Sequence, residues 1–351
     1  MRSLFSWALP LALALPAYAQ DALTVGSASA KRGEKASGWI DVPAAADPGV
    51  RIPVSVVHGA KPGPVLALVA GTHGVEYTSV VALPRVLERL DPARMTGSVI
   101  LVHMANPPGF YGRRVYYGPD GLNQNRVYPG KADGSVSERI AFAITRSVID
   151  QATHLVDMHC GDGNESLRPY AYWDLTGNAA VDAQTREMAL AYGLGHVVVG
   201  RDMPKDAAKS VYTTNTALTR GKPAITVESG GMGLTDEASV AAQEAGALSV
   251  ARQLGIQSDA PSVRTEKVTW YDRSEVLRAP VDGVWYPAVE KTQMVAAGAL
   301  VGTLRDPFGA TLTEIRAPFA GEMLYVVATP PAGKGEPLGM VAQVAAGEPG
   351  R

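Results

Sequence analysis

The fold of this chain is decided by the stretch Pro64-Val65-Leu66-Ala67-Leu68-Val69-Ala70-Gly71-Thr72-His73-Gly74-Val75-Glu76. Its first seven residues form an apolar run, which predicts a strand buried on both faces. The glycines that follow permit a sharp turn into a helix. The turn places His73 and Glu76 at the end of a strand, where open α/β sheets keep their ligand sites.

A histidine and a glutamate at this place are candidate metal ligands. Catalytic zinc sites commonly combine two histidines and one glutamate with a water. His-x-x-Glu also arises by chance, so a third ligand is needed. His159 is the best candidate, because it ends the strand-like run of residues 153–158. Asp157, on the same face of that strand, would orient the imidazole. A structural histidine at a strand end is the alternative interpretation.

Glu228 is the candidate base. It ends the apolar run Pro223–Val227 and precedes Ser229-Gly230-Gly231. A carboxylate at a strand end beside a glycine turn is well placed to activate water. A surface glutamate before a turn is the alternative. Cys160, next to His159, is interpreted as a small buried hydrophobe.

A long polar loop, residues 110–134, supplies arginines, and loops of that length are uncommon unless they are functional. It contains Arg113, Arg114 and Arg126. One arginine fork would bind a carboxylate in bidentate fashion, and a second near the metal would stabilise an oxyanion. A solvated basic loop is the alternative. Arg168 is a further candidate for binding substrate, with ordinary packing as its alternative.

The rest of the chain predicts an α/β fold. Apolar periodicity predicts helices over 79–90, 135–149, 180–193 and 236–254, which alternate with short strands. This alternation predicts a mixed, mostly parallel sheet with helices on both faces. Residues 20–50 show little periodicity.

After residue 262 the helical periodicity ends and short β-like runs follow. Arg278-Ala279-Pro280-Val281-Asp282-Gly283 is echoed by Arg316-Ala317-Pro318-Phe319-Ala320-Gly321, which suggests a small all-β barrel or sandwich of two similar halves. We therefore predict a catalytic domain over 20–258 and a C-terminal β domain over 262–351.

Residues 1–19 have the composition of a secretory signal peptide. Met1-Arg2 precedes a short apolar core, and Ala17-Tyr18-Ala19 supplies a small-x-small end, so cleavage is expected after Ala19. A membrane anchor is the alternative, but the apolar core is short for a span. A periplasmic or secreted protein is predicted, with no membrane span after cleavage.

Charge and cysteine content exclude some kinds of partner and cross-link. The formal net charge is -2 and no basic patch indicates nucleic acid. The single cysteine, Cys160, excludes an intrachain disulfide.

Taken together, the motifs resemble the succinylglutamate desuccinylase/aspartoacylase family, a branch of the zinc carboxypeptidase superfamily. The matching pieces are Gly-x-His-Gly-x-Glu (71–76), Asn-Pro (106–107), an arginine, Asn-Arg-x-Tyr-Pro-Gly (125–130), Asp-x-His (157–159) and Thr-Val-Glu-x-Gly-Gly (226–231). The resemblance covers roughly residues 50–345, because the family also carries a C-terminal β domain.

The resemblance implies one zinc ion bound by His73, Glu76 and His159, with Glu228 as general base and acid. It implies that Asn125 and Arg126 hold a substrate carboxylate. An upstream arginine, for which Arg114 looks like the counterpart, would polarise the scissile carbonyl. Asn123-Gln124 stands where the family usually has Asn-Leu or Asp-Leu, and the spacing from Arg114 is long, so the choice between Arg113 and Arg114 stays open.

The sequence thus predicts an exported zinc-dependent amidohydrolase that cleaves N-acyl amino acids by metal-activated water. A metallocarboxypeptidase acting on peptides or cell-wall fragments is one alternative, and a non-catalytic binding protein on the same fold is another. The β domain resembles the biotinyl/lipoyl type, but its connecting hairpin, residues 304–309, has no lysine to modify. A structural or lid role is therefore expected for it.

Overall fold

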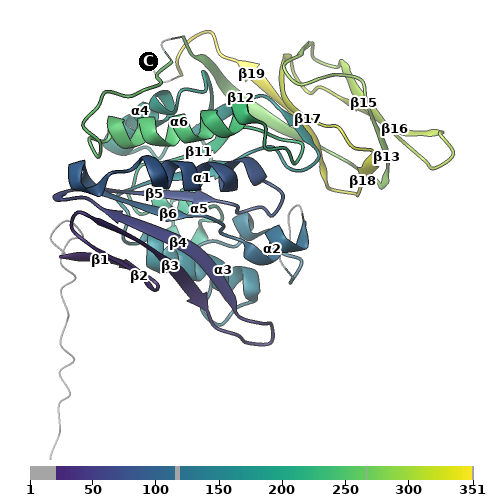
Figure 1. Cartoon of the computed structure of the whole chain (residues 1–351). Helices are drawn as coiled ribbons and strands as arrows, with labels where there is room; N and C mark the ends of the chain where they lie inside the picture. Colours follow the sequence, from purple (N-terminus) through teal and green to yellow (C-terminus); the bar gives the residue numbers. More distant parts are fainter. Residues whose placement is uncertain (1–20, 115–118, 266, 350–351) are drawn as a thin grey trace, which may run out of the picture.

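The computed structural model describes residues 21–114, 119–265 and 267–349, and the predicted signal peptide lies outside them (Figure 1). Its central feature is a large mixed sheet with the strand order β14-β17-β19-β12-β10-β9-β11-β7-β5-β6-β4-β3, in which β8 pairs with β17. The strands of this sheet are β3 (Glu34–Val42), β4 (Val50–His58), β5 (Lys61–Ala70), β6 (Thr96–Val102), β7 (His154–His159), β8 (Glu165–Leu167), β9 (Tyr170–Asp174), β10 (His196–Gly200), β11 (Ala224–Glu228), β12 (Thr269–Arg278), β14 (Met294–Val295), β17 (Gly321–Val327) and β19 (Pro337–Val344).

Parallel pairing is confined to the middle of the sheet. Strands β6, β5, β7 and β11 run parallel to one another, as do β9, β10 and β12. The two groups meet at an antiparallel pair, β11 with β9. Antiparallel strands complete both ends of the sheet. The prediction of a mixed sheet is confirmed.

Helices cover both faces of the sheet, as predicted (Figure 1). They are α1 (Tyr77–Arg89), α2 (Pro107–Gly112), α3 (Val136–Ile144), α4 (Ala179–Tyr192), α5 (Thr213–Leu218) and α6 (Glu237–Gln253), with short turns η2 (Pro92–Arg94), η3 (Gln124–Arg126) and η5 (Ala207–Lys209) and a π-helical segment η4 (Thr145–Ile149). Alternate residues of a strand point to opposite faces, so Val65 of β5 packs in the core that contains α3 and α5. Leu66 packs in the core that contains α1, α4 and α6.

Local signals in the sequence explain two of these helices. The predicted capping box is present at α3, where Glu138 accepts a hydrogen bond from the backbone of Ser135 at 3.0 Å. Helix α1 runs through Pro84 and ends at Arg89.

In the described part of the chain, no helix is both long and apolar enough to cross a membrane.

The region 20–50, with little periodicity in its sequence, contains three strands. Strands β1 (Ala22–Val25) and β2 (Ala28–Lys31) form a hairpin, and β3 pairs with β4 along its whole length. Strand β3 is an edge strand with many exposed residues, so its hydrophobic pattern is weak. Residues 34–42 form a strand because they pair with β4, and the local sequence does not reveal this pairing.

The C-terminal region forms a β-sandwich. A small sheet contains β13 (Gly283–Pro287), β15 (Leu300–Arg305), β16 (Thr311–Arg316) and β18 (Pro331–Ala332). Its core residues Trp285 and Leu304 pack in one cluster with Met323 and Val341 of the large sheet. Strand β12 pairs with β10 on one edge and with β19 on the other, so the large sheet continues across the predicted domain boundary.

Candidate functional site

Three neighbouring strands bring the predicted residues to one edge of the sheet. Parallel pairing places Ala70, at the end of β5, beside Met158 of β7, and Glu228 of β11 beside His159 of β7. Gly71 follows β5 with φ +68°, a conformation that a side chain disfavours. The turn at this glycine directs the following segment, with His73, back over the strand ends.

His73, Glu76 and His159 form a buried cluster at this edge. His73 Nδ1 lies 2.5 Å from Glu76 Oε1, and His159 Nδ1 lies 2.8 Å from Glu76 Oε2. One donor atom from each residue lies within 4.8 Å of the other two. The three side chains therefore form a candidate metal site.

The donor set fits a divalent cation. Two imidazoles and one carboxylate are the protein ligands of many catalytic zinc sites, which leave one position for water. Within the described residues, Glu76 Oε2 is buried and makes no hydrogen bond of normal geometry, although His159 Nδ1 is near it. A cation held between these atoms would satisfy the buried oxygen.

In each candidate ligand histidine, the second ring nitrogen, Nε2, contacts a neighbouring polar side chain. Asp157 Oδ2 lies 3.0 Å from His159 Nε2, and Asn123 Oδ1 lies 3.2 Å from His73 Nε2. Such contacts orient ligand rings and leave Nδ1 directed at the metal position. The sequence analysis anticipated the contact of Asp157. It missed Asn123, whose signal was its place two residues before the Asn125-Arg126 pair.

The electrostatics of the cluster follow from close pairing of buried charges. Burial lowers the pKa of His73 and His159, but neighbouring carboxylates outweigh it and raise both pKa values. Burial raises the pKa of Glu76, yet the two imidazoles lower it to about 2. The pKa of Glu228 is raised well above its usual value, chiefly by burial. The two imidazoles thus favour the ionised form of Glu76, whereas burial favours the neutral form of Glu228.

A cavity of 410 Å³ opens over the cluster. Its lining includes His73, Glu76, Asn123, Arg126, Cys160, Asp162, Glu165, Tyr170, Tyr172, Glu228, Val276, Arg278, Tyr325, Lys334, Gly335, Glu336, Pro337 and Met340. Residues from Val276 onward belong to the C-terminal region, which therefore forms part of the wall. No sequence motif marks these C-terminal residues as part of a site.

Asn125 and Arg126 lie beside the cluster but face different surroundings. Arg126 lines the cavity, and its guanidinium lies 4.6 Å from the ring centre of Tyr212. Asn125 is buried, with Nδ2 lying 3.3 Å from His159 Nε2 and Oδ1 accepting a hydrogen bond from the backbone of Thr213. Arg126 can reach a substrate, whereas Asn125 braces the loop against the cluster.

The other predicted arginines lie away from this cavity. Arg113 and Arg114 are exposed at the end of α2, beside residues 115–118, which lie outside the described residues. Arg168 forms an ion pair with Glu322, and its Nη1 lies 2.6 Å from His196 Nε2. None of the three lines the cavity among the described residues. Their proposed roles therefore stay predictions.

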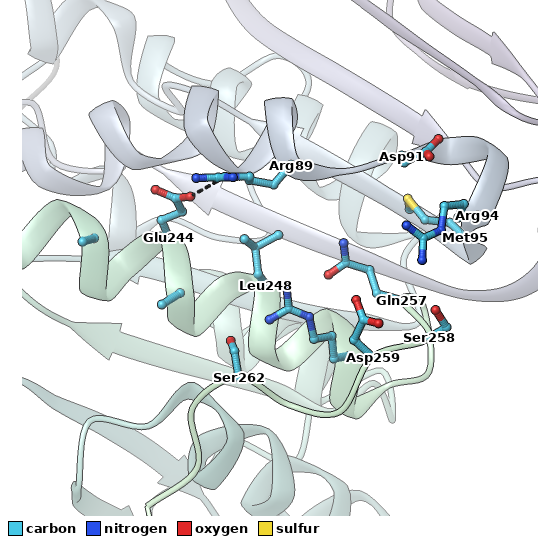
Figure 2. A pocket seen from close by; sticks show the side chains of 13 residues that line it. Arg89, Asp91, Arg94, Met95, Glu244, Leu248, Gln257, Ser258, Asp259 and Ser262 are labelled. Carbon is cyan, nitrogen blue, oxygen red and sulfur yellow. Dashed lines mark hydrogen bonds and ion pairs between the residues drawn. The ribbon is translucent and has the colours of Figure 1, made fainter.

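A second cavity, of 430 Å³, lies between α1, α6 and the segments that follow these two helices (Figure 2). It is lined by the end of α1, by residues 91–95, by one side of α6 and by residues 257–262. Arg89 Nε lies 3.3 Å from Glu244 Oε1 across it. Its lining contains three arginines and three carboxylates but no histidine, so it lacks the ligand set of the first cavity.

Comparison with known proteins identifies the family. A model of the succinylglutamate desuccinylase/aspartoacylase catalytic domain matches residues 62–254, which is more than half of the chain. The chain belongs to the succinylglutamate desuccinylase/aspartoacylase family. This confirms the resemblance inferred from the sequence motifs.

One curated member of the family is similar in sequence. It is the N-alpha-acetyl-L-2,4-diaminobutyric acid deacetylase of Halomonas elongata, which is 33% identical over 198 residues. The match spans 56% of this chain and 56% of that relative.

Solved structures of family members share the fold over nearly the whole chain. A product-bound ectoine utilization protein from Ruegeria pomeroyi has a TM-score of 0.78 at 24% identity, covering 90% of this chain and 98% of that one. A succinylglutamate desuccinylase/aspartoacylase from Rhodobacter sphaeroides has a TM-score of 0.77 at 23% identity, covering 89% and 96%. These likenesses establish the fold, including the C-terminal β-region.

Proposed function

We propose that this protein is a zinc-dependent amidohydrolase that removes the acyl group from N-acyl amino acids. The observation that carries the proposal is the buried cluster of His73, Glu76 and His159 with Glu228 directly beside it on the next strand. The Halomonas relative is a deacetylase of an acetylated amino acid, which is the same class of reaction. We also propose export, on the basis of residues 1–19 alone.

His73, Glu76 and His159 would hold the zinc ion, which when bound would polarise the scissile carbonyl and acidify a water. Glu228 would accept the proton of the attacking water and pass it to the departing amine. Burial raises the pKa of Glu228, and a carboxyl with a raised pKa is a stronger base toward the proton of water. Asp157 would keep the ring of His159 in place throughout.

Arg126 would orient the substrate. Its guanidinium is held between the face of Tyr212 and the backbone oxygen of Asn125, to which Nη1 donates at 2.8 Å. A held guanidinium loses little further freedom when it binds a carboxylate in bidentate fashion. The carboxylate of the amino-acid part is the matching group.

The test combines metal content with turnover. The chain from residue 20 should contain one zinc per molecule and should release free amino acids from N-acyl amino acids in a chelator-sensitive manner. Glu228→Gln should keep the zinc but lose hydrolysis by at least about 10³-fold, the scale of a lost proton-transfer group with its electrostatic support.

Two outcomes would contradict the proposal. Unchanged hydrolysis in Glu228→Gln would remove that residue from the mechanism. Cleavage of peptides only, with N-acyl amino acids untouched, would make the protein a carboxypeptidase.

A further inference from the structure

Gln243, on α6, is a fully buried amide that reaches the ends of the two strands carrying His159 and Glu228. Its Nε2 donates to the backbone oxygen of His159 at 2.7 Å and to that of Ser229 at 3.1 Å. Gln243 does not line the cavity. Any effect that it has on the reaction therefore passes through these two strand ends.

The hydrogen-bond ladder between β7 and β11 ends at these residues. Glu228 pairs with His159, and the backbone N–H of Ser229 donates to the oxygen of His159 at 3.2 Å. The oxygen of Ser229, a buried residue, lies beyond this last ladder bond. A buried carbonyl without a partner costs free energy comparable to a lost hydrogen bond. Gln243 supplies a donor there and ties both strands to one side chain.

The amide of Gln243 is itself held in one orientation. The hydroxyl of Tyr192, the buried last residue of α4, donates to Gln243 Oε1. The oxygen of the amide thus faces a donor, and its nitrogen faces two acceptors. A flipped amide would place its oxygen against two carbonyl oxygens, where it has nothing to donate.

Gly246 permits Tyr192 to approach α6 this closely. A Cβ at Gly246 would lie 2.4 Å from Cε1 of the Tyr192 ring. Glycine inside a helix is unfavourable relative to alanine, and the packing of the ring accounts for its presence here. Two helices and two strand ends therefore meet at one pair of side chains, Gln243 and Tyr192, which we call the amide brace.

We infer that Gln243, oriented by Tyr192, is a positioning residue that fixes the place of His159 relative to Glu228. The inference rests on the proposed function, in which these two residues are a metal ligand and the base. The same Nε2 bonds the carbonyl of the ligand itself and that of the residue next to the base. Because a shift of about 1 Å in reacting groups can cost about 10²-fold in rate, the brace affects the reaction without touching substrate.

The test replaces each member of the brace. Gln243→Met keeps a long side chain and removes both donors. It should lower zinc affinity and kcat by about 10-fold to 100-fold, the range for partners that orient metal ligands. KM should change little, since Arg126 stands on a different segment, η3. Tyr192→Phe should act in the same direction by a smaller factor, because the amide keeps its donors.

Ser249→Ala is the matched control. Ser249 is a fully buried residue of the same helix, and its Oγ donates to the backbone oxygen of Val263 at 2.7 Å. Its loss should lower stability to urea but leave zinc affinity, measured by chelator competition, and kcat as in the wild type. If Gln243→Met matches this control in both quantities, Gln243 is merely structural and the inference is overturned.

Hydrogen exchange, which needs no turnover, separates this result from failure of the proposed function. In Gln243→Met, the backbone amides of Ser229 and Gly161 should exchange at least about tenfold faster, because the strand ends open locally. Gly161 N–H donates to the oxygen of Gly230 at 2.9 Å, just beyond the brace. Amides in the middle of β7 and β11 should keep wild-type rates.

Faster exchange at the strand ends in a chain whose wild type lacks deacylase activity would contradict the proposed function and support the brace. Wild-type exchange at Ser229 and Gly161 in Gln243→Met would overturn the inference. If Gln243→Met does not fold, Tyr192→Phe decides by the same measurements, and wild-type exchange and zinc affinity in that variant would overturn the inference.

Discussion

Two cavities of this protein, one over the strand ends and one between α1 and α6, have similar volumes but different linings. The one at the carboxyl ends of β5, β7 and β11 is 410 Å³ and encloses buried ligand groups directed at one point. The other is 430 Å³, and its charges come from α1, α6 and the segments that follow them (Figure 2). The side chain of Arg89 there is 71% exposed. The comparison shows that convergence and burial of polar groups, more than volume, mark a reactive site.

The largest expected difference between the cavities comes from replacing one glutamate in each. Glu76→Gln should lose bound zinc and reduce kcat/KM by at least about 10³-fold, because a negative ligand is removed. Glu244→Gln, in the second cavity, should leave both quantities unchanged. Zinc content by elemental analysis and kinetics on an N-acyl amino acid measure the two effects. Retained zinc and activity in Glu76→Gln would break the comparison.

A second test concerns His103, a histidine outside the candidate metal cluster whose pKa is shifted in the opposite direction. His103 directly follows β6 and contacts Ser55 Oγ at 2.8 Å, with burial lowering its pKa to about 4. The unfolded chain therefore binds more protons between about pH 6.5 and pH 4, so stability falls as the pH drops through this window. The full shift corresponds to about 3 kcal/mol.

His103→Gln should remove this part of the acid dependence of the unfolding free energy. Urea unfolding at pH 7 and pH 4.5 measures the change. If the variant keeps the wild-type slope, the acid sensitivity belongs to other groups, and the contrast between His103 and the carboxylate-paired histidines loses its support.

The smallest expected effect lies in the second cavity. Arg89→Ala removes an ion pair between a mostly exposed side chain and Glu244. It should lower the unfolding free energy by less than about 1 kcal/mol and leave kcat/KM unchanged. A tenfold loss of kcat/KM, measured beside the wild type, would show that the second cavity does affect the reaction and that the comparison drawn above is wrong.

Much of the fold could be predicted because its signals are local. The apolar run before His73 specified a buried strand, and Ser135 with Glu138 specified a helix start. Strand β3 could not be predicted in this way, since its many exposed residues give it no clear pattern. Pairing with β4 supplies the hydrogen bonds that hold it.

The sequence by itself determined the family, the alternating α/β order, and the identities of the candidate ligands and base. These rest on residue types at fixed local spacings, which chemistry constrains directly. Only the tertiary structure decided which side chains share a cavity. It separated Arg126, which lines the cavity, from Arg168, which pairs with Glu322. It also brought Tyr325 and Met340 into the same cavity as Glu228, because strand pairing joins segments that are far apart in the chain and leaves no mark in either one alone.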